Sequence, residues 1–368
     1  MTTPRSVRHL IKGLGPGGAE RLVLNHVRAD SGSTDHHVVY VVEEKTHLVP
    51  DLQAAGASVV RLDGSAIGRI RRLRRLMREQ PTDIVHSHSP VLAVTSRLAA
   101  RTLPRSRRPV TVGTEHNRWP RHHRITRFAN RLTICLETAT IAVSDDVATT
   151  IRGARSAQVR TIEHGIDLDA VRAQADRSGA RAELGATDED LIVMCVANLR
   201  REKALDDLVE AARHALGITP TLRFVTVGQG PLAGDLDRWI TAADIGDRFV
   251  ALGYRTDIGR LLSGADMFTL SSRHEGLPVA VMEALAIGLP VVATRAGGIP
   301  EAVGDAGRIV EIGDPMALAA AYVDLARDIE LRARLAAKAR DRAQRFSIER
   351  AVAEITAVYD EATSVSTR

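Results

Sequence analysis

Two glutamates in the second half of the chain stand at a spacing from which their carboxylates could bind sugar hydroxyls. In the segment SSRHEGLPVAVMEALAIG (271–288), a proline opens a predicted helix and the final glycine ends it. Glu275 therefore falls in the loop before this helix, and Glu283 falls within it. Carboxylate oxygens accept hydrogen bonds from the vicinal hydroxyls of a ribose or a hexose.

Two cations and a glycine turn follow other apolar runs of the same half. Arg200 and Lys203 come after LIVMCVANL, and Gly228 lies in the turn VGQGPL after the next run. If these runs are parallel strands, their carboxyl ends meet at the edge that also carries the loop of Glu275. Fixed cations and free backbone N–H groups at such an edge suit a diphosphate. Each turn is ordinary by itself, but together they predict a site for a diphosphate that carries a sugar.

The first half of the chain has a glycine loop of its own. In GLGPGGAER, Gly13, Gly15 and Gly18 spell G-x-G-x-x-G, the pattern of a dinucleotide-binding turn. Such a site also needs an acidic residue about 20 positions further on, and the glutamates at 43 and 44 come later than that. We therefore interpret the loop as a second phosphate contact, in which Gly17 and Gly18 let the backbone approach the phosphates.

Histidines stand at predicted strand ends of the first half. His86 and His88 alternate in TDIVHSH and share one face, which suits a metal site or a polar pair that lines a cleft. Because the sequence offers no third ligand at a metal-binding spacing, we interpret them as acceptor-side residues. His116, at the end of RPVTVGTEH, is predicted to lie in the active site. Asp167 and Asp169 form an Asp-x-Asp pattern in a linker, and we expect no metal there or elsewhere.

Short apolar runs alternate with amphipathic ones along the chain. The predicted strands are 36–43, 57–62, 82–88, 108–116 and 139–146, then 191–199, 221–230, 248–254, 265–272, 290–298 and 307–312. Several are apolar throughout, as in a parallel sheet with both faces covered. This order predicts the α/β fold class with two doubly wound, Rossmann-like domains. Their predicted bounds are 1–170 and 188–346, with a linker over 171–187 and a final helix over 347–366.

The composition is that of a globular protein. The 368 residues, 44% hydrophobic and 26% charged, are enough for two domains. No apolar run is long enough to cross a bilayer and no signal peptide stands at the beginning, so we expect a cytoplasmic protein. Cys135 and Cys195 lie in apolar runs and are predicted to be buried, reduced thiols.

The net charge of +5 is concentrated in the segments 68–79, 101–109 and 117–131. A solvated surface is the simplest interpretation. The last segment also carries Trp119, Ile125 and Phe128 among its cations, which suits peripheral contact with an anionic membrane or an anionic, lipid-linked partner. No recognition motif accompanies the charge, and we expect no nucleic-acid partner.

Together these motifs resemble glycosyltransferase family 4. The resemblance rests on NLRREKALDDLVEA, VGQGPL, the E-x7-E segment and GGIPE in the second half, and on GPGGAER, DIVHSHS, GTEH and HGIDLD before it. It implies the GT-B fold, in which two Rossmann-like domains face across a cleft and a C-terminal helix crosses back to the N-terminal domain. It also implies retaining hexosyl transfer from a UDP- or GDP-sugar, without a cofactor. The acceptor would be lipid-linked, a polysaccharide or a small molecule, in cell-envelope or exopolysaccharide biosynthesis.

The resemblance implies roles for donor-binding residues of the second half. Glu283 would bind the ribose hydroxyls. Glu275, with the backbone of Gly276 and Leu277, would bind the donor sugar. Arg200 and Lys203 would neutralise the diphosphate and stabilise the leaving group, beside the glycine turn that contains Gly228.

Further roles follow from the same resemblance. Arg255 would lie near the base, and His116 near the donor sugar and the attacking hydroxyl. Gly17 or Gly18 would meet the donor phosphates, and His164 replaces an asparagine of the family's linker motif. Two other interpretations stay open: another GT-B enzyme, such as a nucleotide-sugar epimerase or a sugar phosphorylase, and a non-catalytic nucleotide-sugar-binding protein.

Overall fold

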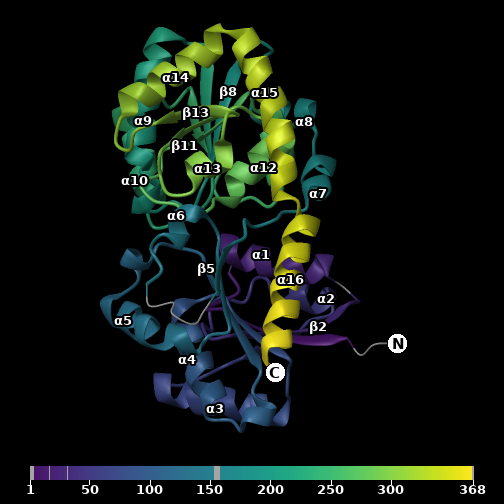
Figure 1. Ribbon diagram of the computed structural model, residues 1–368. Coiled ribbons are helices and arrows are strands. Elements are labelled where there is room, and N and C mark those ends of the chain that lie inside the picture. The colour runs from purple at the N-terminus through teal and green to yellow at the C-terminus, as the bar shows by residue number, and fades with distance from the viewer. Residues whose placement is uncertain (1–3, 16, 31, 153–157, 367–368) are drawn as a thin grey trace. The chain divides into compact units, whose positions relative to one another are not determined.

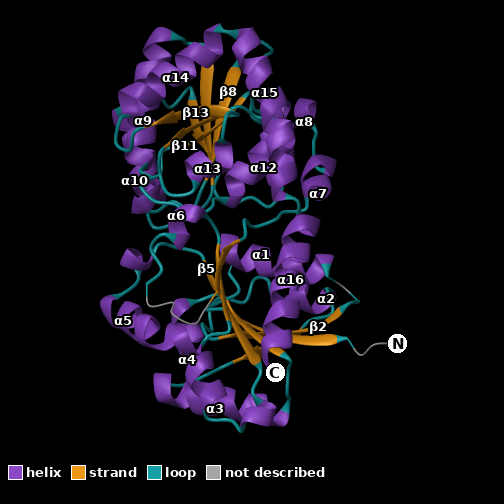
Figure 2. Cartoon of the chain, viewed as in Figure 1, coloured by secondary structure: helices purple, strands orange, loops and turns teal. Residues whose placement is uncertain are grey.

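The computed structural model describes residues 4–15, 17–30, 32–152 and 158–366. The chain forms two compact units (Figure 1). The first comprises Met1–Gly165 together with Ile348–Arg368, and the second comprises Ile166–Ser347. Each unit has its own parallel sheet with helices on both faces (Figure 2). The predicted fold class, two doubly wound α/β domains, is confirmed.

The sheet of the first unit has seven strands in the order β3-β2-β1-β4-β5-β6-β7. Their bounds are β1 Arg5–Leu10, β2 Thr34–Tyr40, β3 Ser58–Arg61, β4 Ile84–Ser87, β5 Val110–Glu115, β6 Ala139–Ala142 and β7 Gln158–Thr161. All neighbours are parallel. The order reverses between β1 and β4, so their carboxyl ends form the switch point at which such sheets bind ligands.

The helices of the first unit cover both faces of this sheet. They are α1 Gly18–Ala29, α2 Val49–Ala54, α3 Ala66–Glu79, α4 Pro90–Arg101, α5 Arg124–Thr133, α6 Asp145–Ala148 and α16 Ile348–Ser366. Neighbouring residues of a strand point to opposite faces. Val38 of β2 accordingly packs in the cluster of α1 and α2, and Val39 packs in that of α3 and α4. The C-terminal helix α16 packs on β5 and α1 of this unit.

The sheet of the second unit has six parallel strands in the order β10-β9-β8-β11-β12-β13. They are β8 Leu191–Val196, β9 Leu222–Val227, β10 Phe249–Ala251, β11 Met267–Leu270, β12 Val291–Thr294 and β13 Gly307–Val310. The helices are α7 Leu168–Ala173, α8 Arg177–Glu183, α9 Leu205–Ile218, α10 Ala233–Ala242, α11 Ile258–Gly264, α12 Val279–Ile287, α13 Ile299–Val303, α14 Pro315–Arg327 and α15 Ile329–Ala343. Here the switch point lies between β8 and β11.

The segment 171–187, predicted to be a linker, is instead part of the second unit. It carries the end of α7 and all of α8, which pack on α12 and α11. Arg177 and Arg181 of α8 form ion pairs of 2.7 and 3.1 Å with Asp266, directly before β11. The polar residues that suggested a linker therefore form ion pairs within the second unit. This unit begins at Ile166 rather than at 188.

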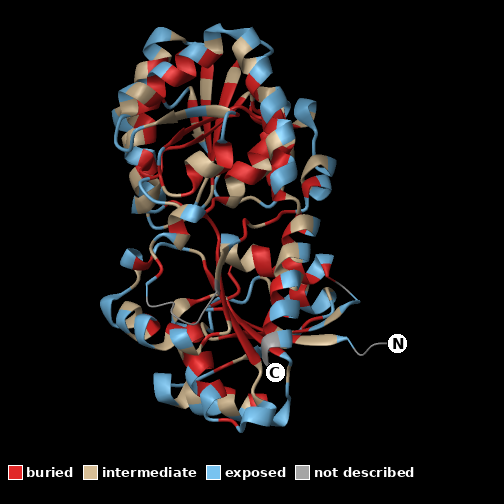
Figure 3. Ribbon diagram, in the orientation of Figure 1, coloured by how far each residue is buried: buried red, intermediate tan, exposed pale blue. Residues whose placement is uncertain are grey.

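The strands lie in buried layers beneath helices whose outer faces are exposed (Figure 3). Cys195 of β8 is buried as expected, whereas Cys135 is exposed. Within the part of the chain that the structure describes, no helix combines the length and apolar character needed to cross a membrane.

Candidate functional site

A lysine and a glutamate meet at the switch point of the second sheet. Lys203 closes a short 3-10 helix, Arg201–Lys203, that follows β8, and Glu275 lies in the loop between β11 and α12. Lys203 Nζ lies 2.5 Å from Glu275 Oε1, and the two side chains are only 17% and 9% exposed. The hydroxyl of Ser272 donates a 2.6 Å hydrogen bond to the same carboxylate oxygen. A cation and a carboxylate are thus held together where a parallel sheet presents its ligand-binding edge.

The backbone fixes the loop that carries Lys203. Ala204 adopts the left-handed conformation (φ 47°), which ends the 3-10 turn and starts α9. The hydroxyl of Ser271 donates to the carbonyl oxygens of Lys203 and Ala204, at 2.8 and 2.9 Å. The amide of Arg273 donates to the carbonyl of Glu202 at 2.8 Å. The end of β11 therefore holds the lysine in place before any ligand arrives.

Two glycines allow the loops at this edge to approach one another. Gly228 has φ +147°, and a Cβ there would lie 1.9 Å from the carbonyl oxygen of Ala197. Gly297 has φ +54°, and its Cβ would lie 1.9 Å from the carbonyl oxygen of Glu275. Only glycine fits such contacts. The loop after β9 and the loop after β12 are therefore packed directly on the loops that carry the cations and Glu275.

The other predicted donor-binding residues of this unit are distributed around the pair. Arg200 is exposed beside the 3-10 turn, Leu277 is buried before α12, and Glu283 is partly exposed within α12. The carbonyl of Gly276 accepts a 2.9 Å hydrogen bond from the amide of Gly298. These positions agree with the expected loop and helix assignments, and their roles stay predictions.

Arg255, predicted to lie near a base, has its guanidinium occupied by two carboxylates. It pairs with Asp257, at 2.7 Å, and with Glu183 of α8, at 2.5 Å. These partners hold the pKa of Arg255 above its ordinary value. Arg255 therefore forms ion pairs with Glu183 and Asp257 rather than with the Lys203–Glu275 pair.

The first unit gathers histidines at the corresponding edge of its sheet. His116 follows β5, and its Nδ1 lies 3.1 Å from Nε2 of His164, with the two rings stacked. Burial lowers the pKa of His116 to about 4 and that of His164 well below its usual range. His116 is therefore neutral near pH 7, the form in which an imidazole can accept a proton.

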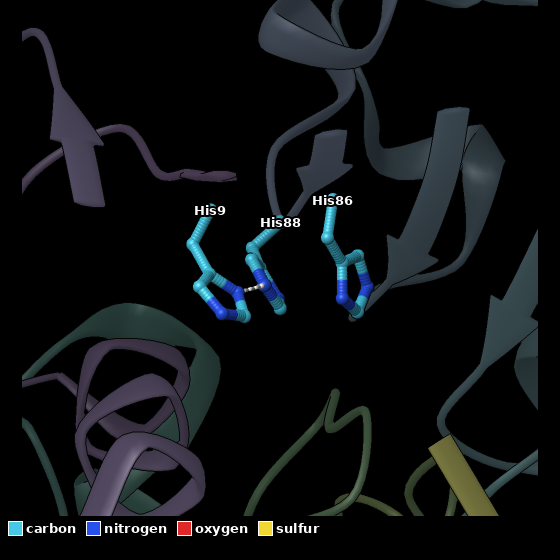
Figure 4. A group of neighbouring side chains, drawn as sticks. All are labelled: His9, His86 and His88. Atoms are coloured by element: carbon cyan, nitrogen blue, oxygen red, sulfur yellow. Dashed lines mark hydrogen bonds between the residues drawn. The ribbon is translucent and has the colours of Figure 1, made fainter. Parts of the chain in front are cut away.

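His86 and His88 have a third histidine beside them. Nδ1 of His9, on β1, lies 3.1 Å from Nε2 of His88, and the rings of His86 and His88 are 4.1 Å apart (Figure 4). Sequence reasoning found no third partner because His9 is 79 residues from His88 along the chain and becomes its neighbour only through the β1–β4 pairing. Both ring nitrogens of His86 are already hydrogen-bonded, to the Tyr359 hydroxyl at 2.6 Å and the Thr114 hydroxyl at 2.7 Å.

The glycine loop of the first unit leads directly into α1. Gly17 is the N-cap residue and makes no side-chain cap, and Gly18 is the first helical residue. A Cβ on Gly17 would lie 2.3 Å from a carboxylate oxygen of Glu20. The expected contact of Gly17 and Gly18 with phosphates stays a prediction.

The basic segment 117–131 has an apolar side. On α5, Ile125, Phe128 and Leu132 are 73%, 65% and 60% exposed. Arginines stand between them in the sequence RITRFANRLT. A row of exposed large apolar side chains among cations is the composition of helices that bind at an anionic lipid interface.

Sequence reasoning missed two groups of polar residues around these sites. Ser272 was not singled out, although a hydroxyl three residues before Glu275 can reach its carboxylate. A second group, His26, Asp30 and His36, offers a possible metal site in the first unit. The i, i+4 spacing of His26 and Asp30 places both on one helix face, and this was the available signal.

Two family models match the chain. The model described as "Glycosyl transferases group 1" matches residues 176–342, and "Glycosyltransferase Family 4" matches residues 5–170. Each match lies almost entirely within one structural unit.

Curated relatives and solved structures agree with these matches. Putative glycosyltransferase EpsD of Bacillus subtilis strain 168 is 28% identical over 305 residues, which are 78% of this chain and 79% of that protein. UDP-Gal:alpha-D-GlcNAc-diphosphoundecaprenol alpha-1,3-galactosyltransferase of Escherichia coli is 27% identical over 250 residues, 61% of each chain. The crystal structure of Anabaena HepE with UDP and glucose has a TM-score of 0.84 at 21% identity, covering 97% of this chain and 100% of HepE.

Proposed function

Because this chain belongs to glycosyltransferase family 4 and has the GT-B fold, we propose that it transfers a hexosyl group from a UDP- or GDP-sugar with retention of anomeric configuration. The observation that carries the proposal is the Lys203–Glu275 pair at the switch point of the second sheet. The pair presents a cation for phosphate and a carboxylate for sugar hydroxyls side by side. This is the charge pattern of the junction between a diphosphate and a sugar.

The roles in donor binding follow from these positions. Glu275 would accept hydrogen bonds from the donor sugar, and Glu283 would accept them from the ribose. Lys203 and Arg200 would bind the diphosphate. As the bond between the anomeric carbon and the phosphate oxygen breaks, negative charge builds on that oxygen, and a cation already in place stabilises it.

Retention is proposed to follow from attack on the same face from which the phosphate leaves. The acceptor oxygen bonds to the anomeric carbon as the phosphate oxygen departs, and the acceptor proton passes to that phosphate oxygen. The protein needs no nucleophile for this step. Transfer therefore rests on electrostatic stabilisation by Lys203 and Arg200, and neutral His116 is our candidate for contact with the acceptor hydroxyl.

The acceptor is proposed to be lipid-linked or a growing polysaccharide of the cell envelope. Two observations support this choice. The exposed apolar and basic side of α5 suits peripheral contact with an anionic membrane. In addition, the Escherichia coli relative is named for a diphosphoundecaprenol acceptor. The two free cysteines fit a reducing compartment, so we place the enzyme at the cytoplasmic face of that membrane.

A donor screen tests the proposal. The purified chain is incubated with UDP-, GDP- and ADP-hexoses without acceptor, and slow release of free sugar is followed by ion chromatography. We expect hydrolysis of at least one UDP- or GDP-sugar, and NMR of the first released sugar should show the anomer of the donor. Binding of a donor without hydrolysis would instead indicate a non-catalytic nucleotide-sugar-binding protein, and absence of both would refute the enzyme assignment.

A substitution tests the ribose role of Glu283. Glu283→Gln should weaken UDP or GDP binding about 10- to 100-fold, because a hydrogen bond to a charged group contributes about 1.5–3 kcal/mol. The matched control is Glu210→Gln on α9, whose carboxylate pairs with Arg213 at the surface of the same unit. Isothermal titration measures both, and equal affinities for the two variants would contradict the role.

A further inference from the structure

Three polar side chains of the first unit converge where α1 ends beside β2. His26 and Asp30 come from the last turn and the C-cap of α1, and His36 comes from β2. One ligand atom from each lies within 4.8 Å of the others. All three residues are buried, with 5%, 9% and 4% of their surface exposed. Burying three such groups together is costly unless they satisfy one another or share a ligand.

Two ring nitrogens in this group make no hydrogen bond. Nε2 of His26 and Nε2 of His36 are both buried and have no hydrogen-bonding partner. Nε2 of His36 lies 3.5 Å from Oδ2 of Asp30, outside hydrogen-bonding geometry. Buried polar atoms are rarely left in this state. Both atoms are the kind of donor that binds a transition metal.

The neighbouring group of His9, His86 and His88 differs in this respect. The two nitrogens of His86 are occupied by Tyr359 and Thr114, and those of His9 by His88 and His36. These rings already form a hydrogen-bonded network. The unsatisfied nitrogens therefore select His26, Asp30 and His36 as the binding group.

Neighbouring groups orient the three side chains and add negative charge that favours a bound cation. Nδ1 of His36 lies 3.1 Å from Nε2 of His9, so His9 fixes which nitrogen of His36 faces Asp30. The hydroxyl of Ser33 donates to the other carboxylate oxygen of Asp30. The carbonyl end of α1 adds the negative end of the helix dipole, which favours a cation at this place.

We propose that His26, Asp30 and His36 bind one divalent transition-metal ion of the Zn²⁺ class, which joins the end of α1 to β2. Two imidazoles and one carboxylate are a donor set that Zn²⁺ accepts and that Mg²⁺ does not favour. In a tetrahedral Zn²⁺ site, neighbouring ligand atoms are about 3.3 Å apart, close to the 3.5 Å between Asp30 and His36. This inference does not rest on the proposed sugar transfer.

The site would stabilise the helix that follows the glycine loop. α1 begins at Gly18 and its last turn carries His26, so an ion at its end anchors the helix against the sheet. An ion that binds only the folded chain stabilises it in proportion to its affinity and concentration. The expected role is structural support of α1.

Metal titration of the whole chain is the test. The protein is stripped with a chelator and exchanged into metal-free buffer, then titrated with Zn²⁺ and separately with Co²⁺, whose visible spectrum reports imidazole ligation. We expect one equivalent of Zn²⁺, an apparent Tm raised by about 5 °C at saturation, and a Co²⁺ spectrum of low-coordinate type. Mg²⁺ should give none of these.

Four variants decide which residues bind the ion. Asp30→Asn and His36→Gln should abolish stoichiometric binding, and His9→Gln should weaken it about 10- to 100-fold as an outer-shell change. His37→Gln is the matched control, since His37 is the next residue of β2, points to the opposite face and pairs with Asp35. Circular dichroism of each stripped variant shows whether it is folded.

Three outcomes would overturn the proposal. The first is absence of stoichiometric Zn²⁺ binding by the folded wild-type chain. The second is binding that survives in folded Asp30→Asn and His36→Gln. The third is a Co²⁺ spectrum that changes in His86→Gln but stays the same in His36→Gln. This result would assign the ion to the neighbouring group of His9, His86 and His88.

Discussion

The two units have the same kind of parallel sheet but opposite electrostatics at its switch point. In the second unit, Lys203 and Glu275 hold a full positive and a full negative charge at the edge. In the first unit, His86 and His88 stand at the edge and His116 follows, each with a pKa lowered by burial and therefore neutral near pH 7. One fold thus presents fixed charge in one unit and uncharged proton acceptors in the other.

The difference shows how two similar folds can present edges that suit different ligands. Fixed charges suit a ligand with its own charge, such as a diphosphate, because they need no reorganisation when it binds. Neutral imidazoles suit a hydroxyl acceptor, because they exchange hydrogen bonds without a buried charge. The fold supplies only the edge, and the residues placed on it decide the chemistry.

The largest expected effect separates the units by pH. Burial keeps four histidines of the folded first unit neutral well below pH 6.5, namely His86, His88, His116 and His164. In the unfolded chain the same histidines take up protons as the pH falls below about 6.5. The unfolded state binds more protons there, so stability falls as pH decreases from about 6.5 towards about 4. For His116 alone the loss is about 3 kcal/mol.

Three glutamates of the first unit act in the opposite direction, because burial raises the pKa of Glu20, Glu115 and Glu137. The pKa of Glu115 rises to about 7, so the folded state holds its proton between about pH 4.5 and 7, and this contribution offsets part of the loss from the four histidines on acidification. Single-tryptophan variants separate the units, because Trp119 lies in the first and Trp239 in the second. Trp239→Phe keeps Trp119, whose fluorescence then reports on the first unit, and Trp119→Phe keeps Trp239, which reports on the second. The acid-unfolding midpoint should lie at a higher pH in Trp239→Phe than in Trp119→Phe. Equal midpoints in the two variants would contradict the electrostatic contrast between the units.

The next effect concerns the charged edge of the second unit. Lys203→Ala should lower kcat about 10²- to 10³-fold, the usual cost of removing one preorganised group that stabilises transition-state charge. Lys338→Ala is the matched control, because Lys338 pairs with Asp305 at 2.8 Å on the surface of the same unit. Steady-state rates with the donor found in the screen measure both, and a kcat for Lys203→Ala close to wild type would remove its leaving-group role.

The smallest expected effect is on metal dependence of the reaction. If Lys203 and Arg200 bind the diphosphate as proposed, cations of the chain take the place of a catalytic metal, and EDTA should leave the initial rate within about twofold of the untreated enzyme. The rate is measured well below the melting temperature, so that loss of a stabilising ion from the first unit lowers Tm without affecting the assay. A rate abolished by EDTA and restored by Mg²⁺ or Mn²⁺ would contradict metal-free transfer.

Strands built from apolar runs were predicted well. LIVMCVANL became β8 and the buried run in RPVTVGTEH became β5, because strands covered on both faces must be apolar. Two strands of the first sheet were missed. β1 was missed because arginines and a histidine interrupt the apolar residues of RSVRHL, and β7 because QVRT is short and polar at the edge of its sheet. The linker over 171–187 was wrong for a related reason, because arginines that pair with Asp266 look like solvent-facing residues in the sequence.

The sequence by itself determined the two doubly wound halves and the loop positions of Glu275, Lys203 and the glycine turns. Apolar runs, glycines and prolines act locally, so their pattern can be read along the chain. Tertiary structure alone decided that Lys203 meets Glu275, 72 residues away, and that His9 meets His88 and His36. Strand order brings such residues together, and the ion pairs and hydrogen bonds that result depend on distances of a few ångströms, which local patterns do not encode.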